Sequence, residues 1–247
     1  MNILVCVSRV PDTATKVKVA DDGKSIATQN VKFILNPYDE FAVEEGLRLR
    51  EQHGGSVTVL TVGGQESTDI LRTALAMGAD KATLIQLANP DSYQVAVNIA
   101  QYARNHSFDL ILFGRQSIDF DSFQVPPMVA QLLDLPCLTI VSQWSVTNGT
   151  VKAERDIEGG KEEFETTLPL VASVQKGINE PRYPKLPDII KAKSKPIETI
   201  EPVAVEPQLE ILSMEIPQTE RRHVILGDSD EDLEKLIQLL REEAKVI

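Results

Sequence analysis

The residues with the clearest chemical potential lie in one polar loop, residues 114–127, with the sequence GRQSIDFDSFQVPP. The loop follows the apolar run FDLILF and places a glycine, two aspartates and two prolines before an expected helix. Asp119 and Asp121 can accept hydrogen bonds from the hydroxyl groups of a sugar, or they can shape the turn and cap the helix. The residues alone are compatible with both roles.

Catalytic motifs are missing from the rest of the chain. The sequence has no P-loop, no GxGxxG, no CxxC and no G-x-S-x-G elbow. His53, His106 and His223 have no nucleophile or carboxylate at a recognisable spacing. Cys6 and Cys137 lie in apolar runs and are expected to be reduced core thiols. This pattern favours a binding scaffold without catalytic residues of its own over an enzyme.

Expected strands and helices alternate along the first two thirds of the chain. Apolar runs at 2–8, 56–64, 81–87 and 108–114 predict buried strands, and helices are expected after Pro37 and within 65–80, 91–106 and 124–135. This alternation predicts an α/β fold with a doubly wound, mostly parallel, Rossmann-like sheet. Ligands of such sheets bind beyond the carboxyl ends of the strands, so the loops after residues 8, 62 and 114 are the candidate site.

Two regions depart from this alternation. Residues 143–168 contain Asn148-Gly149 and Gly159-Gly160 between alternating segments, which predicts antiparallel hairpins. From Pro181 onward, prolines punctuate the chain, and no helical periodicity is expected until the amphipathic segment 228–247. We therefore predict a domain over 1–180, and an arm with a C-terminal helix over 181–247. The arm either wraps over its own domain or embraces a partner subunit.

Charge and hydropathy exclude several function classes. The net charge of -12 argues against nucleic-acid binding, which needs a basic surface. The sequence contains no run of about 18 apolar residues, so no membrane-spanning helix is predicted. The N-terminal stretch is typical of a first strand rather than a signal peptide, so a cytoplasmic location is expected.

Six stretches of the chain resemble, in order, the β subunit of electron transfer flavoprotein. They are ILVCVSRVPD, NPYDEFAVEEGLRLRE, RTALAMGAD, LILFGRQSIDFDSFQ, ERDIEGG and INEPRYPKLPDIIKAKSKPIE. Together they cover roughly residues 1–200, and RTALAMGAD and NEPRY are the most specific of them.

The resemblance implies an electron carrier made of an α and a β subunit. Such proteins hold one FAD mainly in the α subunit, accept electrons from acyl-CoA dehydrogenases and related flavoenzymes, and pass them to a membrane quinone oxidoreductase or another acceptor. The β subunit usually buries a structural AMP. In the alternative, electron-bifurcating branch a second FAD replaces the AMP and NADH is the donor. A third possibility is a separate nucleotide-binding or nucleotide-hydrolysing protein on the same fold, although no phosphate-binding glycine loop supports it.

Carried over by position, the resemblance implies an adenine-nucleotide site at the ends of three strands and at one helix start. Its residues are Cys6, Asn36, Pro37, Tyr38, Asp39, Val62, Gly63, Gly114, Arg115, Gln116, Ser117, Ile118, Asp119, Phe120, Asp121, Ser122, Phe123, Gln124 and Val125.

The chain departs from the family pattern where the nucleotide phosphate is expected. Related chains have Asn-Gln-Thr-Gly or Ala-Gln-Val-Gly-Pro where this chain has Phe-Gln-Val-Pro-Pro, residues 123–127. Pro126 and Pro127 remove two backbone N–H groups from the helix start that would hold an anion. We therefore expect a nucleotide whose phosphate is held less by this helix, or a site that is altered or empty.

The resemblance also implies a loop that docks the dehydrogenase, with Leu186 as its anchor. A leucine between Pro184 and Pro187 would lose little conformational entropy on binding. Lys191, Lys193 and Lys195 would supply a basic patch on an acidic chain. The expected docking residues are Leu186, Pro187, Ile190, Lys191 and Lys193. The alternative is an ordinary surface loop in which the leucine is buried.

Overall fold

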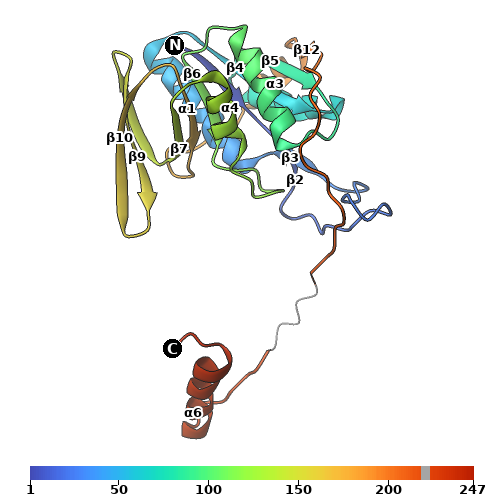
Figure 1. Cartoon of the computed structure of the whole chain (residues 1–247), viewed down its shortest axis with the longest axis vertical. Helices are drawn as coiled ribbons and strands as arrows, with labels where there is room; N and C mark the ends of the chain where they lie inside the picture. Colours follow the sequence, from blue (N-terminus) through green and yellow to red (C-terminus); the bar gives the residue numbers. More distant parts are fainter. Residues whose placement is uncertain (218–222) are drawn as a thin grey trace.

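The computed structural model describes residues 1–217 and 223–247, and its centre is a parallel sheet (Figure 1). Within these residues seven strands follow the order β12-β5-β4-β1-β6-β11-β7, and every neighbouring pair is parallel. The strands are β1 (Asn2–Cys6), β4 (Ser56–Gly63), β5 (Lys81–Gln86), β6 (Leu110–Gly114), β7 (Cys137–Val141), β11 (Leu170–Val174) and β12 (Glu198–Ile200). The predicted doubly wound α/β class is confirmed.

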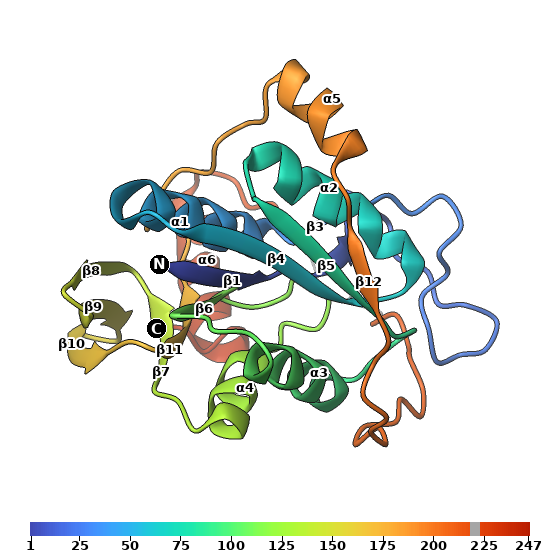
Figure 2. The same ribbon diagram turned by 90° about the horizontal axis from the view of Figure 1, so that it is seen from above.

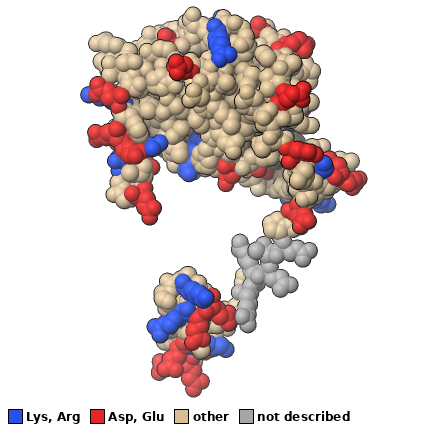
Figure 3. Space-filling model, in the orientation of Figure 1, with Lys and Arg blue, Asp and Glu red and all other residues tan. Residues whose placement is uncertain are grey.

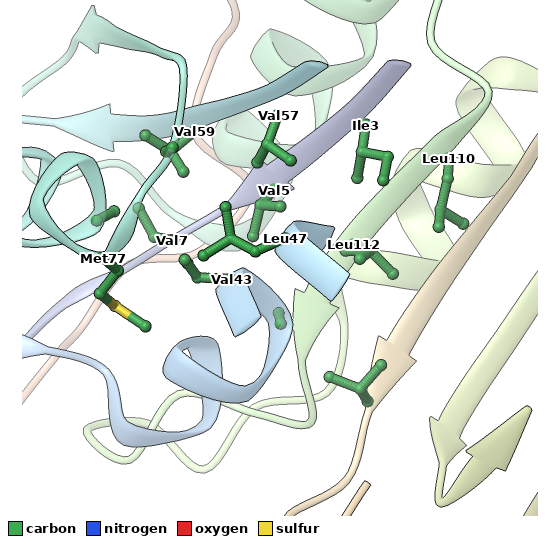
Figure 4. Close-up of a cluster of buried hydrophobic side chains, with 14 of the residues drawn as sticks. Ile3, Val5, Val7, Val43, Leu47, Val57, Val59, Met77, Leu110 and Leu112 are labelled. Carbon is green, nitrogen blue, oxygen red and sulfur yellow. The ribbon is translucent and has the colours of Figure 1, made fainter. Parts of the chain in front are cut away.

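Helices cover both faces of this sheet (Figure 2). The first face carries α1 (Pro37–His53) and α2 (Thr68–Met77, after a 3-10 turn at Gln65–Ser67), and the second carries α3 (Ser92–Arg104) and α4 (Val125–Leu133). Because helices cover both faces of the sheet, every residue of β6 and β11 is buried. Strands buried in this way have mostly apolar sequences without alternation. Figure 4 shows Val43 and Leu47 of α1 packed among the side chains of the central strands.

Helix ends follow the local sequence. Asp91 Oδ1 accepts a hydrogen bond from the Gln94 N–H, and Gln94 Oε1 accepts one from the Asp91 N–H, so α3 begins with a complete capping box. Gly78 ends α2 with a φ of 128°, a conformation that other residues rarely adopt. These signals place the helices close to their predicted ranges.

A separate antiparallel sheet flanks the main one. It contains β8 (Gln143–Thr147), β9 (Thr150–Ile157) and β10 (Gly160–Thr167) in the order β10-β9-β8. Asn148 and Gly149 both have positive φ, 51° and 81°, as a tight hairpin turn requires. The predicted hairpins over 143–168 are therefore confirmed. A small ladder also joins β2 (Arg9–Pro11) to β3 (Phe33–Leu35) ahead of α1.

The expectation that helical structure is lost between Pro181 and residue 228 is wrong. Helix α5 (Leu186–Ser194) packs on the domain with Ala192 buried, and β12 extends the main sheet beyond β5. Pro187 obscured this helix in the sequence. It lies in the first helical turn, where its missing N–H has no intrahelical partner to lose.

The arm after β12 divides into a held part and a separate part. Asn98 Oδ1 accepts the Val203 N–H at 2.8 Å, and the Asp91 carboxylate accepts the N–H groups of Gln208 and Leu209, so this part lies along α3. Residues 218–222 of the predicted arm lie outside the described residues. Helix α6 (Asp230–Gln238), continued by a π-helical turn at Leu239–Glu243, stands apart from the domain (Figure 1).

Candidate functional site

The predicted loops meet where the order of the sheet reverses. From β1 the chain builds outward to β4 and β5, and it then returns through α3 to place β6 on the other side of β1. The carboxyl ends of β4, β1 and β6 therefore lie side by side, and the crevice between β1 and β6 is the switch point of the fold. This brings Cys6, Val62 with Gly63, and Gly114 to one edge.

Asp39 joins the two strands at the switch point. This side chain comes from the first turn of α1 and is 4% exposed. Its Oδ2 accepts the Ser8 N–H at 2.7 Å, and its Oδ1 accepts the Gly114 N–H at 3.1 Å. Burial raises the pKa of this carboxyl group from 3.8 to about 7, although the hydrogen bonds oppose the shift. Asp39 is therefore a titratable buried link between β1 and β6.

Gly114 is required by the closeness of α1. A Cβ atom at this position would lie 2.5 Å from the carbonyl carbon of Tyr38 and would also meet Asp39 Oδ1. A side chain at Gly63 would similarly lie 2.6 Å from Ser67 Oγ. Gly114 thus allows the backbone of α1 to approach the end of β6, and Gly63 leaves room for the Ser67 side chain at the carboxyl edge.

Asn36 holds the long loop after β6. Its side chain is fully buried, its Nδ2 donates to the Gln116 carbonyl at 2.9 Å, and its Oδ1 accepts the Ile118 N–H at 3.3 Å. Pro37 follows as the first residue of α1, where no N–H is needed. Within the predicted group 36–39, Asn36 and Asp39 therefore hold the start of the loop after β6 through its backbone groups.

The loop itself contains polar atoms with unmet bonding capacity. Arg115 Nε and Gln116 Oε1 are buried and have no hydrogen-bond partner within the part of the chain that the structure describes. Elsewhere in these side chains, Arg115 Nη1 donates to Gln175 and Gln116 Nε2 donates to Asp121. A buried donor and a buried acceptor left in this way are suited to a polar ligand.

The two aspartates of the loop make local contacts. Asp119 Oδ1 accepts the Phe120 N–H at 2.9 Å, and Asp121 adopts a φ of 54°. The Asp121 N–H donates to the Ser117 carbonyl at 3.0 Å. Their turn-forming role is thus seen. Helix α4 has no side-chain cap among the described residues, so neither aspartate caps it.

The end of the loop provides few donors at α4. Val125 is the first helical residue, and Pro126 and Pro127 occupy the next two positions. The Gln124 N–H points to Ser122 Oγ at 3.4 Å, and the Met128 N–H bonds the Gln124 carbonyl. Val125 therefore retains the one N–H of the first three helical residues. Phe123 lies beside this point, with the Arg115 guanidinium 5.5 Å from its ring centre.

Cys6 closes the inner side of the site as a neutral thiol. It ends β1 and is buried, and burial, followed by the nearby Asp39 charge, raises its pKa well above the usual value. The thiol is therefore not activated as a nucleophile. Within residues 1–217 and 223–247 no group of three or more acidic, histidine or cysteine side chains could hold a metal ion.

The predicted docking residues all lie on α5. Leu186 is 70% exposed and Ile190 60% exposed, and Lys191 and Lys193 lie in the last turn. Pro187 lies in the first helical turn. The alternative of a buried leucine does not hold for this chain. The segment is a helix rather than the loop that was expected.

Sequence reasoning missed the side chains that hold the start of this segment. Glu44 and Glu45 of α1 are buried, and they bond Arg182 and Asn179 respectively. Glu45 also accepts the Trp144 Nε1–H at 2.8 Å. The signal was a pair of acids inside the apolar stretch AVEEGL, which a solvent-facing helix surface does not explain.

Comparisons with known proteins agree with this geometry. The sequence model of the electron transfer flavoprotein domain matches residues 24–205. The chain is 43% identical to the electron transfer flavoprotein subunit beta of Bacillus subtilis, with all of both chains covered. It is 37% identical to the human subunit beta, over 94% of this chain and 95% of the relative. The chain belongs to the electron transfer flavoprotein β-subunit family.

Family membership sets the general role of the chain. It is similar over 94% of its length, at 36% identity, to the subunit beta of Syntrophomonas wolfei, of which 92% is covered. The role is therefore that of a β subunit in electron transfer, and the family name indicates a flavin. Among the described residues no helix is both long and apolar enough to cross a bilayer.

Proposed function

We propose that this chain is the β subunit of a heterodimeric electron carrier that contains one FAD, held mainly by its α subunit. FAD supplies one-electron and two-electron chemistry when bound. The β chain contributes a covering surface, a nucleotide site and a docking helix. Its donors are acyl-CoA dehydrogenases or related flavoenzymes, and a membrane quinone oxidoreductase or another acceptor receives the electrons.

We further propose that the switch point holds a structural AMP. The observation that carries this proposal is the pair of unpartnered buried atoms, Arg115 Nε and Gln116 Oε1, in the loop beyond β6. They offer a donor and an acceptor to a nucleotide, while backbone groups near Cys6 and Val62 line the same edge. Asp119 and Asp121 lie beside them and supply carboxylates for ribose hydroxyls.

The phosphate is held weakly by α4 in this proposal. The proline pair leaves the Val125 N–H as the available donor in the first three helical positions. Arg115 is the one cationic residue of the loop 114–127, and its guanidinium lies 5.5 Å from the ring centre of Phe123. The nucleotide would therefore be retained mainly through its adenosine part.

Donors would dock on α5, where Leu186 is the proposed anchor. The exposed apolar side chains Leu186, Ile189 and Ile190 lie among lysines on a chain whose net charge is -12. An exposed leucine on an ordered helix can enter an apolar pocket at low entropic cost.

Nucleotide analysis of the purified heterodimer tests this assignment. After denaturation, the released nucleotides are separated by anion-exchange chromatography and quantified against protein. One FAD and one AMP per heterodimer support the proposal. Two FAD molecules without AMP indicate the electron-bifurcating alternative, and FAD alone overturns the AMP assignment.

A further inference from the structure

Helix α5 is fastened to the domain at both of its ends. The chain that enters it, residues 179–182, is bonded to α1, and the chain that leaves it is bonded to α2 and the loop beyond. Between these attachments, Leu186, Ile189 and Ile190 point to solvent. An apolar helix that is exposed and yet held in this way must be positioned by its attachments, because it buries little surface of its own.

Arg182 makes the main attachment at the entry. Its Nε and Nη2 donate to the two oxygens of Glu44 at 2.7 and 3.0 Å, and its Nη1 donates to Glu51 Oε1 at 2.7 Å. The Arg182 backbone N–H also donates to Glu44, at 3.2 Å. A forked pair of this kind fixes direction as well as distance.

The environment of Glu44 makes this contact more than a surface ion pair. The Glu44 side chain is 5% exposed, and Arg48 is its other cation, at 3.4 Å. Glu44 and Glu51 raise the pKa of the Arg182 guanidinium further above its usual range, so the charge is permanent. Removal of the arginine side chain would leave the buried Glu44 carboxylate with Arg48 as its one cation and the backbone N–H of residue 182 as its remaining donor there.

The exit is attached through backbone carbonyls. Arg72 of α2 donates to the carbonyl groups of Ala192 and Lys195, and Lys195 Nζ donates to the Ala79 carbonyl at 2.8 Å. Ala192 is buried beneath this contact. The exit therefore stays in place when the entry is released, and a change at Arg182 would tilt or fray the N-terminal turn that carries Leu186.

We propose that Arg182, bound by Glu44 and Glu51, is a positioning residue for the binding of the electron donor. It holds the first turn of α5 so that Leu186 is presented in one orientation before the donor arrives. This inference rests on the proposed function of α5 as the docking site. It adds a residue that does not touch the donor but sets the entropic cost of binding it.

Steady-state kinetics of the assembled heterodimer test the inference, with a purified acyl-CoA dehydrogenase reduced by its acyl-CoA substrate as the donor. Arg182→Gln is expected to raise KM for the dehydrogenase about tenfold with kcat nearly unchanged. Flavin content and the rate of reduction by dithionite, which needs no docking, should stay the same. Arg182→Lys should recover part of the loss. Glu51→Gln, which removes the outer and half-exposed contact, should raise KM about twofold.

Arg155→Gln is the matched control. Arg155 is 31% exposed against 36% for Arg182, and its Nε likewise donates to a glutamate, Glu162, but it lies on β9. The KM of the Arg155→Gln heterodimer for the dehydrogenase should not change. In the double variant with Leu186→Ala, Arg182→Gln should add little, because both act through one contact.

Three results would overturn the inference, and the first of them leaves the proposed docking site intact. If Leu186→Ala raises KM and neither Arg182→Gln nor Glu51→Gln does, the docking site stands and the positioning role fails. If Leu186→Ala leaves KM unchanged, the docking proposal fails and the positioning role with it. Loss of flavin in Arg182→Gln and Glu51→Gln together would make Arg182 a general structural residue instead.

Discussion

The carboxyl edge of the sheet and helix α6 differ in how far their side chains are buried and bonded within this chain. At the edge, Asn36 and Asp39 bond four backbone groups of two other segments from fully buried positions. In α6, Leu233, Leu236 and Ile237 are 42–51% exposed, and the helix buries none of its residues among those described. Figure 3 shows acidic and basic side chains gathered around this isolated helix.

This difference separates what the chain stabilises by itself from what it leaves for a partner. A helix as short as α6 is marginal in water without packing of its apolar side. Its N-terminus is well formed, since Ser229 Oγ accepts the Asp232 N–H at 3.2 Å and acids fill the first turn. Helix α6 therefore lacks a surface that covers its apolar side, whereas the backbone groups that Asn36 and Asp39 bond at the carboxyl edge are already paired within the chain. We expect substitutions at the two places to differ sharply in their effect on the free energy of unfolding.

The largest effect is expected at Gly114. Gly114→Ala should lower the free energy of unfolding by about 3 kcal/mol, because the new methyl group overlaps the backbone of α1. Chemical denaturation of the β chain measures this. Gly160→Ala is the control, since no atom of the described residues lies within 4 Å of its added Cβ and its φ is not positive. An equal loss in both variants would show that the edge is not unusually tight.

Asp39 should give the edge a pH dependence of intermediate size. Its folded pKa of about 7 lies above the ordinary 3.8, so its contribution to stability is greatest below about pH 4 and is lost as the pH rises through 7. Between pH 5 and pH 7 this loss amounts to about 2 kcal/mol. The difference in free energy of unfolding between the native chain and Asp39→Asn, followed across this range, isolates it from the other carboxyl groups. A pH-independent difference would contradict the raised pKa.

A smaller effect is expected where the held part of the arm meets α3. Asn98→Ala removes the acceptor of the Val203 N–H and should cost about 1 kcal/mol locally. Hydrogen exchange of residues 203–209 should become several-fold faster, with little change in the sheet. Asn105→Ala, at the exposed end of the same helix, should leave this exchange unchanged. Equal protection in both variants would show that Asn98 does not hold the arm.

The carboxyl edge could be predicted from sequence much further than the C-terminal region could. Parallel strands bring their carboxyl ends to one edge, so the apolar runs predicted as strands were enough to place the loops after residues 8, 62 and 114 together. The bonds of Asp39 to Ser8 and Gly114 follow from no local pattern, because they join residues 31 and 75 positions apart. These bonds can be predicted only when the position of α1 on the sheet is known.

The C-terminal region was harder because its signals conflict. The prolines at 184, 187 and 196 indicate a general loss of helix, although Pro187 lies in the first turn of α5. Strand β12 has three residues and depends on pairing with β5, which no periodicity reveals. The two parts of the arm differ in whether they pack on the chain's own domain. Residues 203–209 lie along α3, whereas α6 lies apart from the domain (Figure 1).

The smallest effect on the chain itself is expected in α6, and it is the sharpest test of the comparison. Leu236→Asp and Ile237→Asp replace half-exposed apolar side chains that contact no buried core. They should change the free energy of unfolding of the isolated β chain by less than about 0.5 kcal/mol. The same variants should weaken assembly with the α subunit at least tenfold if α6 packs on that partner, because a charge would enter an apolar contact.

The two measurements together decide what covers α6. Glu234→Gln is the control on the charged side of the helix, and it should affect neither the unfolding nor the assembly. A loss of more than about 1 kcal/mol in the isolated chain would mean that α6 packs on its own domain in solution. Such a result would remove the contrast with the carboxyl edge, since both regions would then be stabilised within one chain, and the apolar side chains of α6 would no longer be available to a partner.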